Sequence, residues 1–139
     1  VGVIGNERLQ TLPLWELHLP GLPEGAPNIA TGRIKWDEKY QKRIGVETKA
    51  VTDLATDAVN RIIHTCKRAY RALQLSGYAR LDFRVTAEGT PFLIEANPNP
   101  QLAYGEDFAE SAHHAGLPYD RLLRKIVSLG EGYRLRGRV

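Results

Sequence analysis

The chain of 139 residues contains no methionine and only one cysteine, Cys66. A single cysteine excludes an intramolecular disulfide framework and an all-cysteine zinc site. It is typical of a reducing compartment, so we expect a cytoplasmic protein. No apolar run reaches the ~18 residues that a membrane span needs, and the sequence holds no internal repeat or low-complexity tract. The composition, 42% hydrophobic and 25% charged residues, is ordinary for a globular protein with a core of its own.

The charge of the chain is close to balance. There are 19 Lys and Arg against 16 Asp and Glu, a net charge of +3. Part of the basic excess lies in residues 130–139, which we interpret as a basic tail. Such a tail can contact phosphate or nucleic acid, but a solvated terminus is the more frequent case. We therefore expect neither a nucleic acid nor a membrane as a partner.

The order of the predicted elements is that of an α+β protein. In chain order they are strands at 1–5 and 12–19, a helix at 52–75, hairpin strands at 78–86 and 91–96, and helices at 107–115 and 118–129. The long helix has Thr52 as its candidate N-cap and Gly77 as its stop signal. The pattern predicts a mostly antiparallel sheet packed by a long helix. Residues 20–32 read as a long loop, of the kind that often serves as a lid, and residues 33–45 have no clear preference.

The predicted hairpin carries a polar face. If a four-residue turn joins its strands, Thr86 pairs with Pro91. The polar face then holds two cross-strand pairs, Arg80 with Asn97 and Asp82 with Glu95. The opposite face would be apolar throughout and would pair Leu81 with Ala96, Phe83 with Ile94, and Val85 with Phe92.

The oxygen atoms on the polar face suggest a metal site. Asp82 and Glu95 would lie about 5 Å apart, where two carboxylates repel unless a cation or a proton lies between them. Carboxylate and amide oxygens are the ligands that Mg²⁺ or Mn²⁺ prefers, with other positions left to water or phosphate. Arg80 could stabilise negative charge nearby. The alternative is a solvated face with salt bridges from Arg80 and Arg84.

The same residues resemble a known family. The stretch Arg80-Leu81-Asp82-Phe83, followed by Phe92-Leu93-Ile94-Glu95-Ala96-Asn97-Pro98-Asn99-Pro100, resembles the carboxy-terminal part of the ATP-grasp ligases, closest to the D-alanine–D-alanine ligase branch. The pattern R-x-D … E-x-N-x-N-P is specific at this spacing. The opening VGVIGN and residues 12–17 look like central strands of that branch, and residues 36–40, WDEKY, are similar to its mobile loop. The resemblance extends to about residue 129.

The resemblance implies a role for each polar residue of the hairpin. Asp82, Glu95 and Asn97 would hold two Mg²⁺ (or Mn²⁺) ions that bridge the phosphates of ATP, with Glu95 between the metals. Arg80 would stabilise an acyl phosphate and the tetrahedral intermediate that follows it. Ile94 would help to form an apolar nucleotide pocket, although the register above places it on the face opposite Glu95.

The resemblance also implies a moving loop over the site. Residues 20–45 would form that loop, Lys39 would reach the ATP phosphates when it closes, and Tyr40 would help to lock it. Closure would exclude water, which would otherwise hydrolyse the acyl phosphate.

Two positions depart from the pattern of the branch. The D-alanine ligases usually follow the Asn-Pro with Gly-Met-Thr, whose glycine N–H serves an oxyanion hole. Gln101 stands there in this chain, and its backbone N–H can keep that role. A serine that binds the carboxylate of the second substrate corresponds to Glu106, which would repel a carboxylate. We therefore expect an amine other than D-alanine, or one that docks differently. We interpret Asp107 as a helix N-cap with Glu110 as its capping-box partner.

These observations predict the carboxy-terminal subdomain of an ATP-grasp fold over residues 1–129, part of an ATP-dependent carboxylate–amine ligase. It would form an amide bond through an acyl phosphate, with ATP, Mg²⁺, a carboxylate and an amine as its ligands. Val1 reads like the middle of a strand, so we expect the amino-terminal part of the ligase to be missing and the isolated chain to be inactive. The alternative is a non-catalytic nucleotide- or Mg²⁺-binding module that keeps the fold. A homodimer is left open.

Overall fold

The computed structural model describes residues 1–133, which divide into two compact units. The first unit combines Val1–Leu14 with the chain from Val51 onward, and the second is Trp15–Ala50. The predicted basic tail begins inside the last helix, and its residues 134–139 lie outside the described part of the chain.

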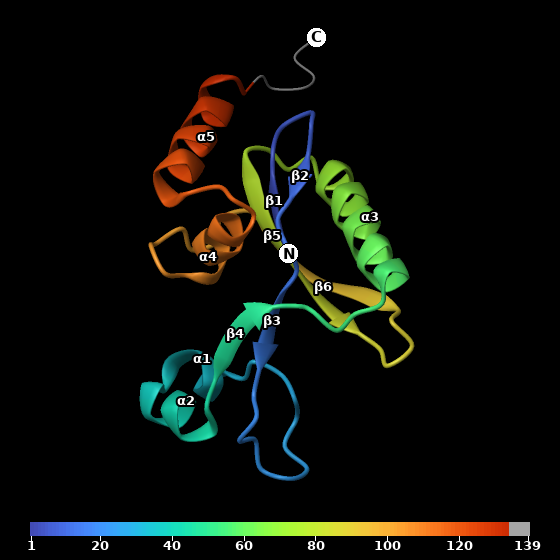
Figure 1. Ribbon diagram of the computed structural model, residues 1–139, viewed down its shortest axis with the longest axis vertical. Helices are drawn as coiled ribbons and strands as arrows, with labels where there is room; N and C mark the ends of the chain where they lie inside the picture. The colour runs from blue at the N-terminus through green and yellow to red at the C-terminus, as the bar shows by residue number, and fades with distance from the viewer. Residues whose placement is uncertain (134–139) are drawn as a thin grey trace. The chain divides into compact units, whose positions relative to one another are not determined.

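The first unit is built on a four-stranded antiparallel sheet with the strand order β2-β1-β5-β6 (Figure 1). Its strands are β1 (Gly2–Ile4), β2 (Gln10–Thr11), β5 (Tyr78–Val85) and β6 (Pro91–Asn97). Its helices are α3 (Thr56–Ala72), α4 (Asp107–His114) and α5 (Tyr119–Glu131). The predicted α+β class, with an antiparallel sheet packed by a long helix, is confirmed.

Both faces of this sheet are covered, because neighbouring residues of a strand point to opposite sides. Figure 1 shows α3 on one side and α4 with α5 on the other. On the α3 side the buried core contains Val3, Ile62, Cys66, Tyr70, Ala79 and Leu81. On the other side it contains Ile4, Leu12, Phe108, Ala109, Ala112 and Leu122. One sheet therefore supports two apolar layers.

Gly2 allows α4 to approach the sheet beside the predicted site. It pairs with Arg80 in the β1–β5 register. A Cβ atom at Gly2 would lie 2.6 Å from Leu12 Cδ1 and 3.0 Å from Phe108 Cε2. A larger residue would therefore displace Phe108, the anchor of α4, at the strand position next to Arg80.

The helix predicted at 52–75 is shorter at both ends. It begins at Thr56 after Ala55, whose ψ of 142° is not helical, so Thr52 is not the N-cap. It ends at Ala72 because Gln74 adopts the left-handed conformation with φ 54°. The N–H of Gln74 then donates to Arg71 O and that of Leu75 to Tyr70 O. These two bonds form a Schellman motif, which stops the helix before the predicted Gly77.

The strand predicted at 12–19 is wrong in part, because only Trp15–His18 form a strand and that strand belongs to a second sheet. Gln10–Thr11, which precede the predicted strand, pair with β1, and the N–H of Leu12 adds a bond to Gly2 O. Pro13 has no N–H to continue the ladder. The chain then enters the second unit, where β3 (Trp15–His18) pairs with β4 (Glu47–Ala50), a strand that the sequence did not predict.

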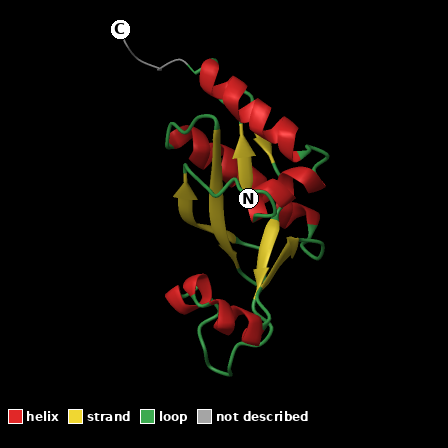
Figure 2. Cartoon of the chain, turned by 90° about the vertical axis from the view of Figure 1, so that its left-hand side faces the viewer, coloured by secondary structure: helices red, strands yellow, loops and turns green. Residues whose placement is uncertain are grey.

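The second unit contains two short helices, α1 (Gly32–Trp36) and α2 (Glu38–Ile44), in the range predicted as a mobile loop (Figure 2). Each has a side-chain N-cap: Thr31 accepts from the Ile34 N–H, and Asp37 from the Tyr40 N–H. Hydrogen bonding to the Tyr40 N–H, helped by Arg33, lowers the pKa of Asp37. Residues 20–31 remain without helix or strand. Mobility of the range stays a prediction.

The hairpin register is confirmed at the site end and shifts by one residue toward the turn. The pairs Arg80–Asn97, Leu81–Ala96 and Asp82–Glu95 are as predicted, but Phe83 then faces Leu93. Ile94 is the extra residue of a β-bulge. The cause lies at the turn, where Thr86 bonds to Thr90 and Val85 pairs with Pro91. The predicted apolar face is therefore wrong for Phe92 and Ile94, which are 56% and 63% exposed.

Candidate metal and nucleotide site

The site consists of the polar face of β5 and β6. Arg80 and Asp82 of β5 lie opposite Asn97 and Glu95 of β6, so the structure brings together the four residues that the sequence placed on one face. Their antiparallel pairing places the side chains of each pair about 5 Å apart. The residues lie at the edge of the sheet, because β6 has no further strand beside it among residues 1–133.

Arg80 forms a two-pronged ion pair with Asp82. Its Nε lies 2.8 Å from Asp82 Oδ1, and its Nη2 lies 2.9 Å from Asp82 Oδ2. These hydrogen bonds raise the pKa of Arg80 against the opposing effect of burial, and the charges of Glu95 and Asp107 raise it further. Three carboxylates therefore act on one guanidinium, and the site has an excess of negative charge.

The oxygen of Asn97 is aimed by the loop that follows β6. Asn97 Oδ1 accepts a hydrogen bond of 2.9 Å from the backbone N–H of Asn99. Asn99 Oδ1 in turn accepts a bond of 2.9 Å from the hydroxyl of Tyr78. Neither a positioning role of Asn99 nor any role of Tyr78 was predicted from the sequence. The alternation N-P-N-P at 97–100 was the signal that could have drawn attention to a rigid loop.

Three exposed apolar residues of β6 precede Glu95 and Asn97 along the strand. Phe92, Leu93 and Ile94 are consecutive and at least 38% exposed. The bulge at Ile94 breaks the strict alternation of side chains, which removes the objection that Ile94 must point away from the face of Glu95. Phe92 lies on the face of Arg80 and Asp82 through its pairing with Arg84, whereas Leu93 pairs with Phe83 on the α3 side of the sheet.

The residues present fit a hard divalent cation. Asp82, Glu95 and Asn97 supply oxygen atoms alone, and Asp107 adds a nearby charge. Within residues 1–133 no three His, Cys, Asp or Glu side chains gather as a metal cluster, so the set depends on the amide of Asn97. Asp82 is already neutralised by Arg80 and would have to share its carboxylate with the cation.

Two further predicted site residues, Gln101 and Glu106, lie in the segment between β6 and α4. Gln101 is exposed just after the buried Pro100. Glu106 is the N-cap residue of α4 and makes no side-chain cap, so the predicted N-cap at Asp107 is wrong; Asp107 is instead the first helical residue. The reason is that Glu106 keeps an extended backbone, with φ −83° and ψ 157°.

Lys39 and Tyr40 lie on α2 in the second unit, and Lys39 is exposed. The ring of Tyr40 is held between two guanidinium groups, with Arg33 Cζ at 4.2 Å and Arg43 Cζ at 4.8 Å from the ring centroid. This cluster was not predicted from the sequence, although residues 33–43 contain five Lys or Arg.

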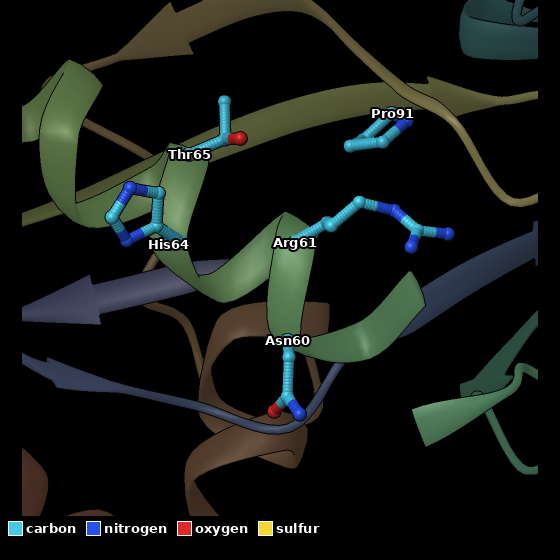
Figure 3. Close-up of a pocket in the computed structure, with 5 residues that line it drawn as sticks. All are labelled: Asn60, Arg61, His64, Thr65 and Pro91. Carbon is cyan, nitrogen blue, oxygen red and sulfur yellow. The ribbon is translucent and has the colours of Figure 1, made fainter. Parts of the chain in front are cut away.

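A shallow pocket elsewhere on the first unit shares no residue with this site (Figure 3). It lies between α3 and the start of β6 and is lined by Asn60, Arg61, His64, Thr65 and Pro91. Arg61 Nη2 donates to Gly89 O at 3.0 Å and ties the helix to the hairpin turn. We interpret the pocket as the seam between these elements.

The hairpin face and the sheet that carries it define the carboxy-terminal class of ATP-grasp fold. The chain belongs to the family described as D-ala D-ala ligase C-terminus, whose model matches residues 1–128. A D-alanine–D-alanine ligase of Desulfotalea psychrophila is 29% identical over 129 residues, which cover 92% of this chain and 37% of that protein. The chain thus spans little more than a third of this relative.

Solved structures agree on the fold. The D-alanine–D-alanine ligase of Bacillus anthracis complexed with ATP gives a TM-score of 0.68 at 21% identity, over 94% of this chain and 37% of that one. The VanG D-Ala:D-Ser ligase of Enterococcus faecalis gives 0.67 at 21% identity, over 92% and 34%. Among residues 1–133 no helix has the length and apolar character to cross a membrane.

Proposed function

We propose that the chain is the metal- and phosphate-binding part of an ATP-dependent carboxylate–amine ligase. The observation that carries the proposal is the arrangement of Arg80, Asp82, Glu95 and Asn97 on one hairpin face, in a chain of this family. Asp82, Glu95 and Asn97 would hold Mg²⁺, which when bound would offset the negative charge of nucleotide phosphates.

Arg80 is the group suited to act on the acyl centre. A carboxylate is a poor acyl donor, so ATP would first convert it to an acyl phosphate. An amine would then attack the carbonyl, phosphate would leave, and an amide would remain. The oxyanion that forms during the attack needs a fixed cationic donor, and the fork of the Arg80 guanidinium supplies several N–H groups. The backbone N–H of Gln101 is a second candidate donor.

ATP is supported as the nucleotide by the ligand of the Bacillus anthracis relative and by the exposed apolar residues Phe92 and Ile94 of the strand that carries Glu95. Exposed apolar side chains beside phosphate-binding groups suit contact with a purine base. Lys39 and Tyr40 would act when the second unit closes over the nucleotide, and the cations beside Tyr40 fit contact with phosphates. We place the reaction in the cytoplasm, where ATP is available.

The acceptor amine is proposed to differ from D-alanine in charge or in its mode of docking. Glu106 is exposed and Asp107 lies close enough to affect Arg80, so this end of α4 is acidic. A carboxylate on the acceptor would be repelled there. The VanG relative, a D-Ala:D-Ser ligase, supports the idea that the acceptor varies on this fold.

The test is ADP release by the full-length protein with a screen of carboxylates and amines. Asp82→Asn combined with Glu95→Gln should abolish amine-dependent ADP release, because phosphate charge is no longer offset. The control, Asp120→Asn with Glu131→Gln, removes the same two charges from α5 and should keep wild-type turnover. Unchanged turnover in the Asp82/Glu95 variant would refute the metal assignment. No ADP release from wild type, with nucleotide still bound, would favour the non-catalytic module.

A further inference from the structure

Tyr78 is fixed in place by packing from below the site. It pairs with Ile4 in the sheet, and its ring meets Phe108 edge-on, with the centroids 5.8 Å apart and the planes at 70°. Phe108 is 3% exposed and belongs to the core under α4. The ring of Tyr78 therefore has little freedom, and its hydroxyl emerges at a defined point beside the loop after β6.

That loop is also stiff. Pro98 and Pro100 fix two φ angles, restrict the residues before them to extended conformations, and flank Asn99 on both sides. Pro100 is buried, which anchors the far end of the loop. The Tyr78 hydroxyl donates to Asn99 Oδ1 at 2.9 Å, so the core below α4 and the loop are tied together at Asn99.

The backbone of Asn99 in turn orients the side chain of Asn97. The backbone N–H of Asn99 donates to Asn97 Oδ1 at 2.9 Å. Because an N–H can only donate, the Asn97 atom that faces it must be the oxygen and not the amide nitrogen. A carbonyl oxygen has two lone pairs, so one remains for a cation. The orientation of the Asn97 amide, a ligand in the proposed metal site, is thus set by the backbone of Asn99.

We propose that Tyr78 and Asn99 are positioning residues that hold the amide oxygen of Asn97 toward the cation. The proposal rests on the metal site of the proposed function and extends it to two residues that touch neither cation nor substrate. An amide without this tether can rotate and present its NH₂ group, which cannot bind a cation. The neighbouring carboxylates of Asp82 and Glu95 have no such ambiguity, so the tether is needed at Asn97 alone.

The experiment measures Mn²⁺ binding to the full-length protein by electron paramagnetic resonance. Tyr78→Phe keeps the ring on Phe108 and removes only the hydroxyl. Asn99→Ala keeps the backbone N–H and removes the side-chain tether. We expect each to weaken Mn²⁺ binding about tenfold, the lower end of what loss of an outer-shell partner costs. Tyr119→Phe, which removes a hydroxyl from the edge-on ring pair of Tyr104 and Tyr119, should bind like wild type.

A double-variant cycle separates positioning from general damage. In an Asn97→Ala background, Tyr78→Phe should cause no further loss of Mn²⁺ affinity, because the oxygen it positions is gone. An equal loss in both backgrounds, or wild-type affinity of the Tyr78→Phe and Asn99→Ala variants, would overturn the proposal. If Asp82→Asn abolishes Mn²⁺ binding in that second case, the metal site stands and only the positioning role falls. If wild type binds no Mn²⁺, both fall.

Discussion

Arg80 and a bound cation compete for the same carboxylate. The guanidinium of Arg80 donates hydrogen bonds to both carboxylate oxygens of Asp82. A cation on Asp82 would therefore lie a few ångströms from a second positive charge, which is unfavourable even with partial screening. The arrangement favours an exchange in which Arg80 loosens its hold on Asp82 when the cation binds. Arg80 then becomes available for the negative charge of a substrate.

This exchange predicts opposite effects of one substitution on two measurements. Arg80→Gln in the full-length protein should tighten Mn²⁺ binding without nucleotide by roughly tenfold, since a competing charge is removed. If the proposed ligation holds, the same variant should lose on the order of 100-fold or more in ligation rate, because the oxyanion would lose its proposed donor. Electron paramagnetic resonance and ADP release provide the two values. Arg68→Gln on α3 is the charge-matched control, and weaker Mn²⁺ binding by Arg80→Gln would contradict the exchange.

At the scale of elements, the hairpin shows what the alternation of side chains along a strand can and cannot predict. The period of two placed Arg80, Asp82, Glu95 and Asn97 on one face, because those residues lie on the side of the bulge away from the turn. The period of two gave the wrong face for Phe92 and Ile94. A bulge adds one residue to a strand, and the sequence on either side still alternates, so the pattern does not reveal the bulge. The bulge was decided by the turn at Thr86–Thr90, which closes one residue tighter than expected.

The end of α3 was missed for a related reason. Gly77 is a strong stop signal, but the helix ends at Ala72, before Gln74, which holds a left-handed conformation that glutamine rarely adopts. The two Schellman hydrogen bonds at Gln74 and Leu75, rather than a glycine, end the helix here. The next strand, β5, begins at Tyr78, so residues 73–77 connect the end of α3 to this strand.

A glycine at position 74 should therefore stabilise the protein. Gln74 holds φ 54° at the C′ position of the Schellman motif, where glycine adopts the conformation without a Cβ penalty. We expect Gln74→Gly to raise the free energy of unfolding by about 0.5–1 kcal/mol. Arg68→Gly, an exposed position inside the same helix, should lower it by about 1 kcal/mol. Urea unfolding followed by circular dichroism measures both, and equal signs for the two variants would refute the interpretation.

At the scale of the whole molecule, the two units differ in how much core they possess. The first unit has buried layers on both faces of its sheet. The second has Ile34 and Ile44 as its buried residues and is shorter than the roughly 40 residues below which domains rarely fold alone. The sequence could not predict this division, because β3 pairs with a strand that lies about 30 residues further along the chain, and that partner, β4, has no strong pattern of its own. Its two ends are fixed within the first unit, where the N–H of Val51 donates to Leu14 O.

The second unit should therefore unfold before the first. Both tryptophans, Trp15 and Trp36, lie in it, so tryptophan fluorescence of the 139-residue chain reports on this unit alone. We expect its transition in urea to precede the loss of helical circular dichroism, because little apolar area is buried there. Ile62→Ala, which opens a cavity under α3, should lower the stability of the first unit by about 2–5 kcal/mol and bring the two transitions together. Val127→Ala, at an exposed position of α5, should leave both transitions in place, and coincident wild-type transitions would show that the units unfold as one.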